Sequence, residues 1–266
     1  MRTQEPLVFD PAASKGKPEN IRNRENPCPF CDIDGLTDIL RRDGDKIWLV
    51  NKFRTLRDTM QTVLIESADH TGDPSNYGRE EWRDILRFSA ECFEEMRSSG
   101  EYRSVLMFKN MGPLSGGTLL HPHLQIVGLY SKDGYSEVSP GNFDGIEAYR
   151  GHGVDVTVSD RPVMGFVEFN VRMEGGYGAM GAFADAVQAT VRYVLGEYHG
   201  KGCTSYNLFF FHTGERFVCK VVPRWVASPY YIGYRISQVN CREDRAAVAR
   251  ELGARLESYI EGEDRR

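Results

Sequence analysis

Two histidines and one glutamine occupy alternate positions in a short segment of the chain. They are His121, His123 and Gln125, and they follow a glycine-rich loop at residues 112–117. Alternate side chains of a β-strand share one face, so the three polar side chains would project together while Leu124 points into a core. A neutral imidazole can attack phosphorus, and backbone N–H groups of the loop can bind phosphate oxygens. The segment is the candidate active site, although a His-x-His pair alone is more often a surface pair or an incidental metal binder.

A second motif, Cys28-Pro29-Phe30-Cys31, brings two thiols within reach of one ion. Zinc bound there would need two further nitrogen or sulfur ligands from elsewhere in the chain. A redox-active dithiol is the alternative, but such a pair usually opens a helix after a strand. Here the pair follows a loop and precedes an acidic segment, which favours a metal. The remaining cysteines are scattered singly, as is typical of small buried side chains: Cys92, Cys203, Cys219 and Cys241.

Composition limits the classes of protein that the chain can belong to. A hydrophobic content of 41% over 266 residues allows one large globular domain or two small ones. The net charge of −5 argues against general nucleic-acid binding. We predict a cytoplasmic protein with no membrane partner, because no apolar run approaches the ~20 residues of a membrane helix and the N-terminus does not resemble a signal peptide.

Hydrophobic periodicity predicts an α+β fold in which helices pack on an antiparallel sheet. The first part of the chain reads as two strands, a helix and two strands, at residues 46–53, 62–67, 79–96, 104–109 and 121–130. The order then repeats loosely as a strand, a helix, two strands and a final helix, at residues 163–173, 179–198, 207–211, 216–222 and 242–260. This repetition indicates two related halves.

The chain is thus predicted to have four parts: an N-terminal arm at 1–27, a first half at 28–135, a connector at 136–160 and a second half at 161–266. The connector is rich in Gly and Asp and lacks clear periodicity, which is typical of a linker or a lid. The arm is polar and rich in Pro and Lys. It is either a flexible lead-in or a segment that brings a cation to a substrate phosphate, from Lys15, Lys17 or Arg22.

Together these motifs resemble the galactose-1-phosphate uridylyltransferase branch of the histidine-triad superfamily. The match is ungapped from Phe108-x-Asn110-x-Gly112 through Thr118 to His121-Pro122-His123-x-Gln125. The Cys28-x-x-Cys31 spacing also agrees, and Ser67–His70 looks like the segment that supplies a histidine to zinc in that family. Weaker likeness covers Val50–Phe53, at the family's nucleoside pocket, and residues 232–234.

The resemblance implies a fold of two histidine-triad-like halves and a structural Zn²⁺ held by Cys28, Cys31, His70 and His121. It also implies that His123 is the nucleophile and that Gln125 hydrogen-bonds the phosphate. The other expected substrate contacts are Asn51, Phe53, Asn110, Gly116, Gly117, Thr118 and Arg235. The implied partners are nucleotides or nucleotide-sugar-like small molecules, and a homodimer is an option because relatives are often dimers.

Gln125 favours a nucleotidyltransferase over a hydrolase within this superfamily. Hydrolytic members have a third imidazole at this position, which can shuttle a proton, whereas an amide can only orient and hydrogen-bond the phosphate. The resemblance therefore implies a covalent nucleotidyl-His123 intermediate that waits for a second phosphate acceptor. We expect a backbone carbonyl of the glycine-rich loop to hold the other ring nitrogen of His123.

Two departures from the family's pattern limit the acceptor. Arg235 stands where the family has an acidic residue in its sugar-recognition segment, and Pro229 replaces a lysine, so a simple hexose 1-phosphate is not expected. A second metal site known in some relatives is also not expected, because Val218 and Lys220 lie near its positions. Two alternatives stay open: a nucleotide phosphorylase or hydrolase, and a zinc-stabilised nucleotide-binding protein without catalysis.

Overall fold

The computed structural model describes residues 5–200, 202–214 and 216–262, so residues 1–4 of the predicted arm lie outside the described residues. The chain forms two compact units. The first consists of Met1–Gly72, Ile85–Lys109 and Gly116–Glu137, and the second of Asp73–Asp84, Asn110–Ser115 and Val138–Arg266. Each unit is built on an antiparallel sheet with helices packed on it, as the sequence predicts.

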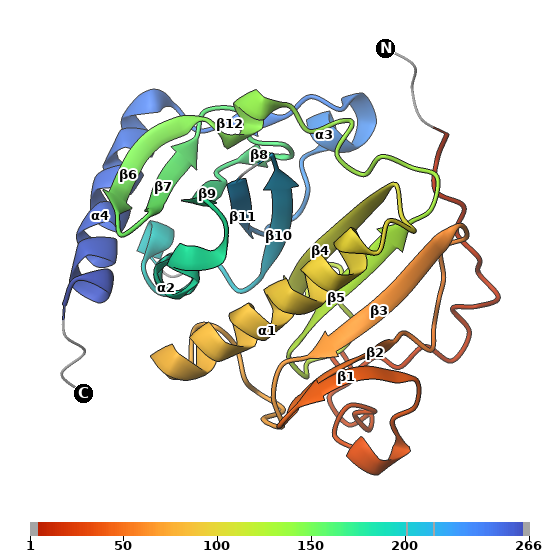
Figure 1. The fold of residues 1–266 in the computed structure, drawn as a ribbon. Helices are drawn as coiled ribbons and strands as arrows, with labels where there is room; N and C mark the ends of the chain where they lie inside the picture. Colours follow the sequence, from red (N-terminus) through yellow and green to blue (C-terminus); the bar gives the residue numbers. More distant parts are fainter. Residues whose placement is uncertain (1–4, 201, 215, 263–266) are drawn as a thin grey trace. The chain divides into compact units, whose positions relative to one another are not determined.

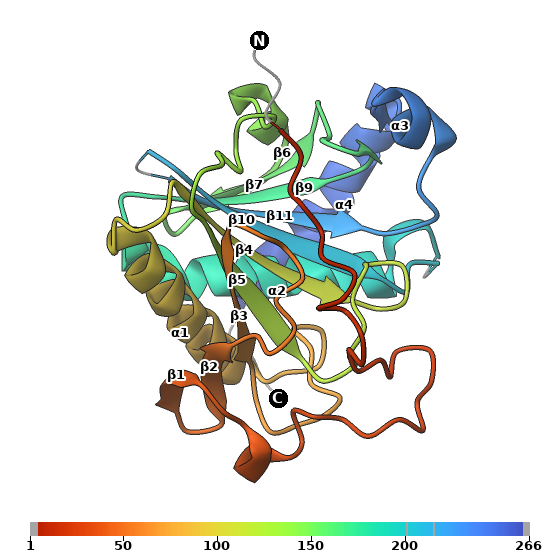
Figure 2. The same cartoon turned by 90° about the vertical axis from the view of Figure 1, so that its right-hand side faces the viewer.

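The first unit contains five strands in the spatial order β1-β2-β3-β5-β4. Their bounds are Ile39–Asp43 (β1), Lys46–Val50 (β2), Thr59–Ile65 (β3), Ser104–Met111 (β4) and His123–Leu129 (β5). Helix α1 (Arg79–Ser98) lies along one face of this sheet, as Figures 1 and 2 show. On the other face, an apolar cluster of Ile47, Leu49, Val63 and Ile65 is covered by Phe30, Ile33 and Leu36. The segment after the Cys-x-x-Cys motif is therefore anchored on the sheet by its own apolar side chains.

The second unit repeats this plan with the order β6-β7-β9-β11-β10. Its strands are Gly145–Gly151 (β6), Val154–Ser159 (β7), Phe169–Glu174 (β9), Tyr206–Thr213 (β10) and Arg216–Pro223 (β11). Helices α2 (Met180–Gly196) and α4 (Arg242–Ile260) pack on each other and on the sheet. Helix α3 is Pro229–Tyr234, and Gly165–Phe166 (β8) pairs in parallel with Gln238–Val239 (β12). Short 3-10 helices span Pro140–Phe143, Tyr177–Ala179 and Tyr198–Gly200 in this unit, and Ile33–Gly35 in the first unit.

The two units share one order of elements, both along the chain and across the sheet. Apart from the short strand β8, each runs three strands, a helix and two strands, and in each the last of these strands pairs with the third. The expectation of two related halves is therefore met at the level of topology.

Sequence periodicity did not reveal strands β1, β6 and β7, nor the two-residue strand β12. Strand β1 is mostly exposed, so it carries little apolar signal. Residues 145–159, assigned above to a connector, instead form β6 and β7 of the second sheet. Strand β7 is buried throughout but contains polar residues that are paired: Asp155 accepts a 2.6 Å hydrogen bond from Arg172, and Thr157 accepts one from Asn170. A charged residue in the middle of a strand hides its apolar pattern.

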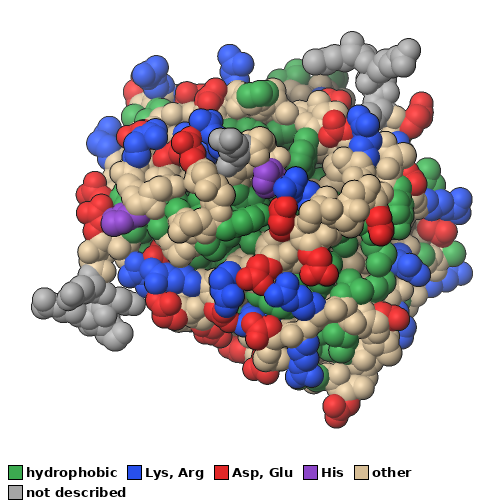
Figure 3. Space-filling view, viewed as in Figure 1, with side chains coloured by type: hydrophobic (Ala, Val, Ile, Leu, Met, Phe, Trp, Pro, Cys, Tyr) green, Lys and Arg blue, Asp and Glu red, His purple; other side chains and the backbone are tan. Residues whose placement is uncertain are grey.

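Surface charge agrees with the composition. On the face shown in Figure 3, acidic and basic side chains are interspersed and form no continuous basic area. Across the described ranges, no helix combines the length and the apolar character needed to cross a membrane.

The glycine-rich loop begins with a residue that only glycine fits. Gly112 has a φ of +80°, and a Cβ there would collide with the carbonyl oxygen of Thr204 and with Oγ of Ser205. The backbone at Gly112 thus lies close to another segment of the chain, residues 204 and 205. Gly116 also has a positive φ, of +88°, but a Cβ at that position would meet no atom within 4 Å.

These two glycines make a matched pair of substitutions. We expect Gly112→Ala to lower the free energy of unfolding by about 2–5 kcal/mol, because backbone strain of ~1–2 kcal/mol adds to an overpacking cost of ~1–3 kcal/mol. Gly116→Ala should show the strain alone, ~1–2 kcal/mol. Denaturant unfolding of the two variants checks the difference, and equal losses would contradict the role of the Thr204 and Ser205 contacts.

Candidate functional site

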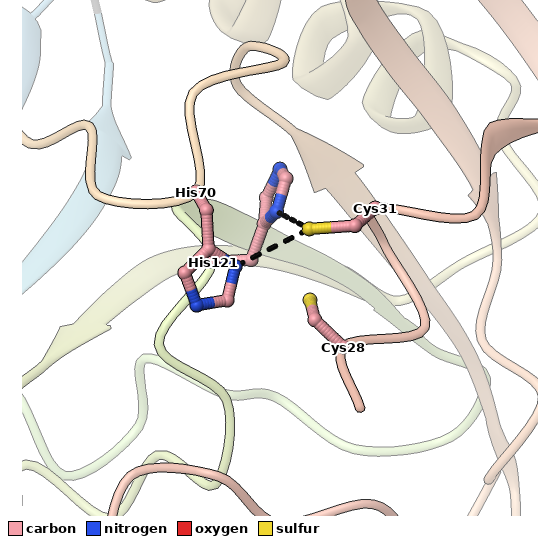
Figure 4. Close-up of side chains that lie close together, drawn as sticks. All are labelled: Cys28, Cys31, His70 and His121. Carbon is pink, nitrogen blue, oxygen red and sulfur yellow. Dashed lines mark hydrogen bonds between the residues drawn. The ribbon is translucent and has the colours of Figure 1, made fainter. Parts of the chain in front are cut away.

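Four side chains from three separate segments converge in the first unit. Cys28, Cys31, His70 and His121 each offer one ligand atom, and these four atoms lie within 4.8 Å of one another. The Cys31 Sγ lies 3.3 Å from Nδ1 of His70 and 3.4 Å from Nδ1 of His121. Figure 4 shows the four side chains pointing toward one another.

Local hydrogen bonds fix the backbone conformation of two of these segments, the one with the cysteines and the one with His70. The N–H of Cys31 donates to the carbonyl of Cys28 and closes the turn between the two thiols. The Asp69 carboxylate accepts hydrogen bonds from both the backbone and the hydroxyl of Thr71, which fixes the turn that carries His70. These two bonds also hold the pKa of Asp69 below its ordinary value.

The donor set fits a metal ion. His121 Nε2 lies 2.9 Å from the carbonyl oxygen of Ser67; a carbonyl only accepts, so the proton is on Nε2 and Nδ1 is free to bind. Burial first, and then the neighbouring Cys28, raise the pKa of the Cys31 thiol. A bound cation would offset this cost by stabilising both thiolates. The cluster can therefore hold a metal ion with two sulfur and two nitrogen ligands.

His123 is the first residue of β5 and is only 8% exposed. Its Nδ1 lies 2.8 Å from the backbone carbonyl of His121. Since this oxygen can only accept, Nδ1 carries the proton and Nε2 keeps its lone pair. The acceptor is a backbone carbonyl, as expected, but it belongs to His121 and not to the glycine-rich loop. The intervening Pro122 has a φ restricted by its ring, which limits the conformations of the backbone between the two histidines.

The His123 ring is held in its neutral form. Burial lowers the pKa of His123 to about 4, and the positive charges of Lys109 and Lys17 act in the same direction, against the hydrogen bond to His121. An imidazole with this pKa is uncharged at neutral pH, as a nucleophile must be.

Gln125 lies on the same face as His123, two residues further along β5. It pairs with Val63 on β3 and Phe108 on β4. The side-chain amide is half-buried and makes no hydrogen bond within the described part of the chain. Phe30 borders the same face, with its ring edge-on to His123 at 5.4 Å between centroids. The face thus presents an imidazole and an available amide beside an aromatic ring.

A buried ion pair that the sequence analysis missed supports this face from below. Lys109 Nζ lies 2.5 Å from Oε1 of Glu66, and the two side chains are 2% and 0% exposed. Lys109 is on β4 and Glu66 follows β3, so the pair spans β5, which lies between these strands. One sequence feature could have indicated this pair: Lys109 alternates with Val105 and Met107 along the strand, and it therefore points to the same buried face.

The N-terminal arm is fastened to the loop that precedes His121. The N–H groups of Asn20 and Ile21 donate to the carbonyl of Thr118, and the Asn20 side chain accepts from the N–H of Leu120. Lys17, three residues before Asn20, is near enough to lower the pKa of His123. This part of the arm is therefore bonded to the rest of the first unit, and a contact between Lys17 and a substrate phosphate remains a prediction.

The other expected substrate contacts are distributed between the two units. Asn51 uses its Oδ1 to accept the N–H of Phe53, which closes a local turn after β2. Gly116, Gly117 and Thr118 lie in the first unit with His123. Asn110 belongs to the second unit, where its Oδ1 accepts a 2.6 Å hydrogen bond from Asn207.

Arg235 also belongs to the second unit, at the C-terminal cap of α3. It is exposed, and its backbone is left-handed with a φ of +58°. The geometry of this residue is typical of a helix C-cap, and its predicted contact with substrate remains a prediction.

Several solved structures are similar to this chain. A DUF4931 family protein from Bacillus cereus ATCC 10987 is 43% identical, with 82% of this chain and 99% of that chain covered and a TM-score of 0.74. More distant are a uridylyltransferase (16% identity, 89% and 92% covered, TM-score 0.66) and an ADP-glucose phosphorylase from Arabidopsis thaliana with bound ADP-glucose (16% identity, 92% and 94% covered, TM-score 0.68). At 16% identity the likeness shows a shared fold.

Sequence comparison leads to the same family as the first of these structures. No curated protein matches the chain. The model of the N-terminal domain of DUF4931, a domain of unknown function, matches residues 9–132, and the model of its C-terminal domain matches residues 135–252. The chain, whose fold is shared with a uridylyltransferase and an ADP-glucose phosphorylase, is a member of the DUF4931 family.

Proposed function

We propose that the protein is a nucleotidyltransferase in which His123 forms a covalent bond to a nucleoside monophosphate. The observation that carries this proposal is the hydrogen bond from His123 Nδ1 to the carbonyl of His121, because it directs the lone pair of Nε2 away from the backbone. Support also comes from the fold shared with a uridylyltransferase and an ADP-glucose phosphorylase. The transferred group is UMP or AMP.

The reaction has two displacements at phosphorus. His123 Nε2 attacks the phosphorus of the nucleotide, the P–O bond to the leaving group breaks, and its electron pair departs with the leaving phosphate. A phosphate oxygen of the acceptor then attacks the same phosphorus, the N–P bond breaks, and its electron pair returns to Nε2. An acceptor phosphate is already anionic at neutral pH, so this second step needs no general base.

Two side chains of the first unit complement the phosphate in this scheme. Gln125 has an amide without a hydrogen-bond partner among the described residues, and it can donate to a phosphate oxygen. Lys17 contributes positive charge close to His123, which favours an anionic ligand. Asn110 and Thr118, from the resemblance, are assigned to further phosphate oxygens, and Asn51 and Phe53 to the nucleoside.

The same intermediate would allow a phosphorylase, in which inorganic phosphate takes the place of the second acceptor. This alternative is kept because a similar fold belongs to an ADP-glucose phosphorylase. Hydrolysis is disfavoured, since water must lose a proton to attack and an amide at position 125 cannot take it.

We further propose that the metal is zinc and that its role is structural. Two thiolates and two imidazoles form the closed tetrahedral set that zinc prefers, with no position left for water. Cys28, Cys31 and His70 would then hold His121, the residue whose carbonyl orients His123.

The metal assignment predicts about one zinc per chain in protein purified without added metal, as elemental analysis would measure. Cys28→Ser should lower both the metal content and the thermal stability, because metal binding energy is partly folding energy. Cys241→Ser, at an exposed cysteine outside the cluster, is the matched control and should keep its metal. Full zinc occupancy in a Cys28→Ser/His70→Ala double variant would contradict the assignment of these residues as zinc ligands.

The covalent intermediate predicts a mass adduct on the protein. We expect incubation with UDP-glucose, ADP-glucose or diadenosine tetraphosphate to add the mass of UMP or AMP, in an acid-labile and base-stable form, as intact mass spectrometry would show. His123→Ala should abolish the adduct and turnover while the protein stays folded and keeps its metal. An unchanged adduct in His123→Ala would place the nucleophile elsewhere.

The departures at Arg235 and Pro229 predict an acceptor other than a simple hexose 1-phosphate. The protein should exchange UDP-glucose with galactose 1-phosphate far more slowly than ~1 s⁻¹, the low end of ordinary enzyme rates. A coupled assay of this exchange tests the point, and a rate at or above that value would show the prediction to be wrong.

A further inference from the structure

A chain of hydrogen bonds in the second unit ends on the side chain of Asn110. Arg224 Nη1 donates to Oδ1 of Asn207 over 3.0 Å, and Asn207 Nδ2 donates to Oδ1 of Asn110 over 2.6 Å. Asn207 Nδ2 also donates to the backbone carbonyl of Ser115 over 3.0 Å. Asn207 is 1% exposed, so these bonds are sheltered from water.

Two groups of fixed polarity decide how the amide of Asn207 is turned. A guanidinium can only donate, so the oxygen of Asn207 must face Arg224. A carbonyl can only accept, so the nitrogen of Asn207 must face Ser115. Both constraints agree, and they leave Asn110 one orientation: its oxygen faces Asn207, and its Nδ2 is left as a donor.

The Nδ2 of Asn110 is then available to a ligand. Asn110 is half-buried, and its Nδ2 makes no hydrogen bond to any residue that the structure describes. We propose that Arg224 and Asn207 are positioning residues that fix Asn110 with Nδ2 presented to a phosphate oxygen of the nucleotide. This inference rests on the proposed function, which assigns Asn110 to phosphate, and it adds the residues that set the direction of that contact.

The surroundings of the Arg224 guanidinium support a positioning role for this residue. Its guanidinium forms no ion pair within the described part of the chain, and its buried Nε has no hydrogen-bond partner there. Burial lowers the pKa of Arg224, and the negative charge of Glu168 offsets only part of this effect. The positive charge at one end of two aligned amides polarises the chain and strengthens the donor at the other end.

A double-mutant cycle tests the proposal. Asn207→Asp keeps an acceptor for Arg224 but removes the donor to Asn110, so the amide of Asn110 should turn its oxygen toward the phosphate. With UDP-glucose, ADP-glucose and diadenosine tetraphosphate as donors, we expect the rate of adduct formation at saturation to fall by ~10²-fold, the usual cost of one lost charge-stabilising donor. The apparent KM should change much less than the rate.

In an Asn110→Ala background, Asn207→Asp should have almost no further effect, because its target is gone. Arg224→Met is a second variant, in case the aspartate disturbs folding. It should lower the rate less, since Ser115 still holds the nitrogen of Asn207, and its effect should also vanish without Asn110. Asn170→Asp makes the same chemical change at a fully buried asparagine of the second sheet, bonded to Lys220, and should leave the rate unaltered.

The outcomes separate this inference from the proposed function. An adduct on the unsubstituted protein that forms equally fast in Asn207→Asp would overturn the inference and leave the proposed function standing. Equal losses with and without Asn110 would also overturn it, by showing that Asn207 acts through the loop at Ser115 and not through Asn110. The absence of any adduct on the unsubstituted protein would overturn both. Metal content and thermal unfolding of each variant confirm that the fold is retained.

Discussion

His121 is the residue on which the candidate site depends, because three of its groups are committed at once. Its Nδ1 faces Cys31 in the four-residue cluster, its Nε2 is held by the carbonyl of Ser67, and its own carbonyl accepts Nδ1 of His123. A shift of this residue would disturb the four-residue cluster and His123 together. The His123 ring is therefore positioned by the backbone and by buried side chains. The hydrogen bond from His123 Nδ1 to this carbonyl keeps the proton on Nδ1 and so fixes the tautomer of His123.

The two units share one topology, but equivalent regions carry different side chains. In the first unit, the four-residue Cys/His cluster and His123 lie next to the strand ends. In the second unit, strand β11 carries Val218 and Lys220, which are both buried. Lys220 Nζ lies 3.0 Å from Glu168 and 2.7 Å from Oδ1 of Asn170, all within the core. Both charges of this pair are buried, so removing either partner alone would leave an uncompensated charge in the core.

The glycine-rich loop has a structural role that its sequence does not reveal. Gly112 is required by its contacts with Thr204 and Ser205, and the hydroxyl of Ser205 also accepts the N–H of Leu114. The part of the loop in the second unit is thus held by contacts within the chain. A motif that reads as a ligand cradle in sequence is, at its first glycine, a close packing of two chain segments.

The sequence by itself determined the α+β class, the two halves, the main helices and the set of residues that could act on a phosphate. These follow from periodicity, from residue chemistry and from a motif whose spacing is local. Tertiary structure alone decided the paired strands β6 and β7, the ion pair of Lys109 with Glu66, the carbonyl that holds His123 and the orientation of Asn110. Each of these depends on partners far apart in the chain that satisfy a charge or a hydrogen bond out of water. Sequence shows which side chains can form such bonds, but only the packing of the sheets selects the partners.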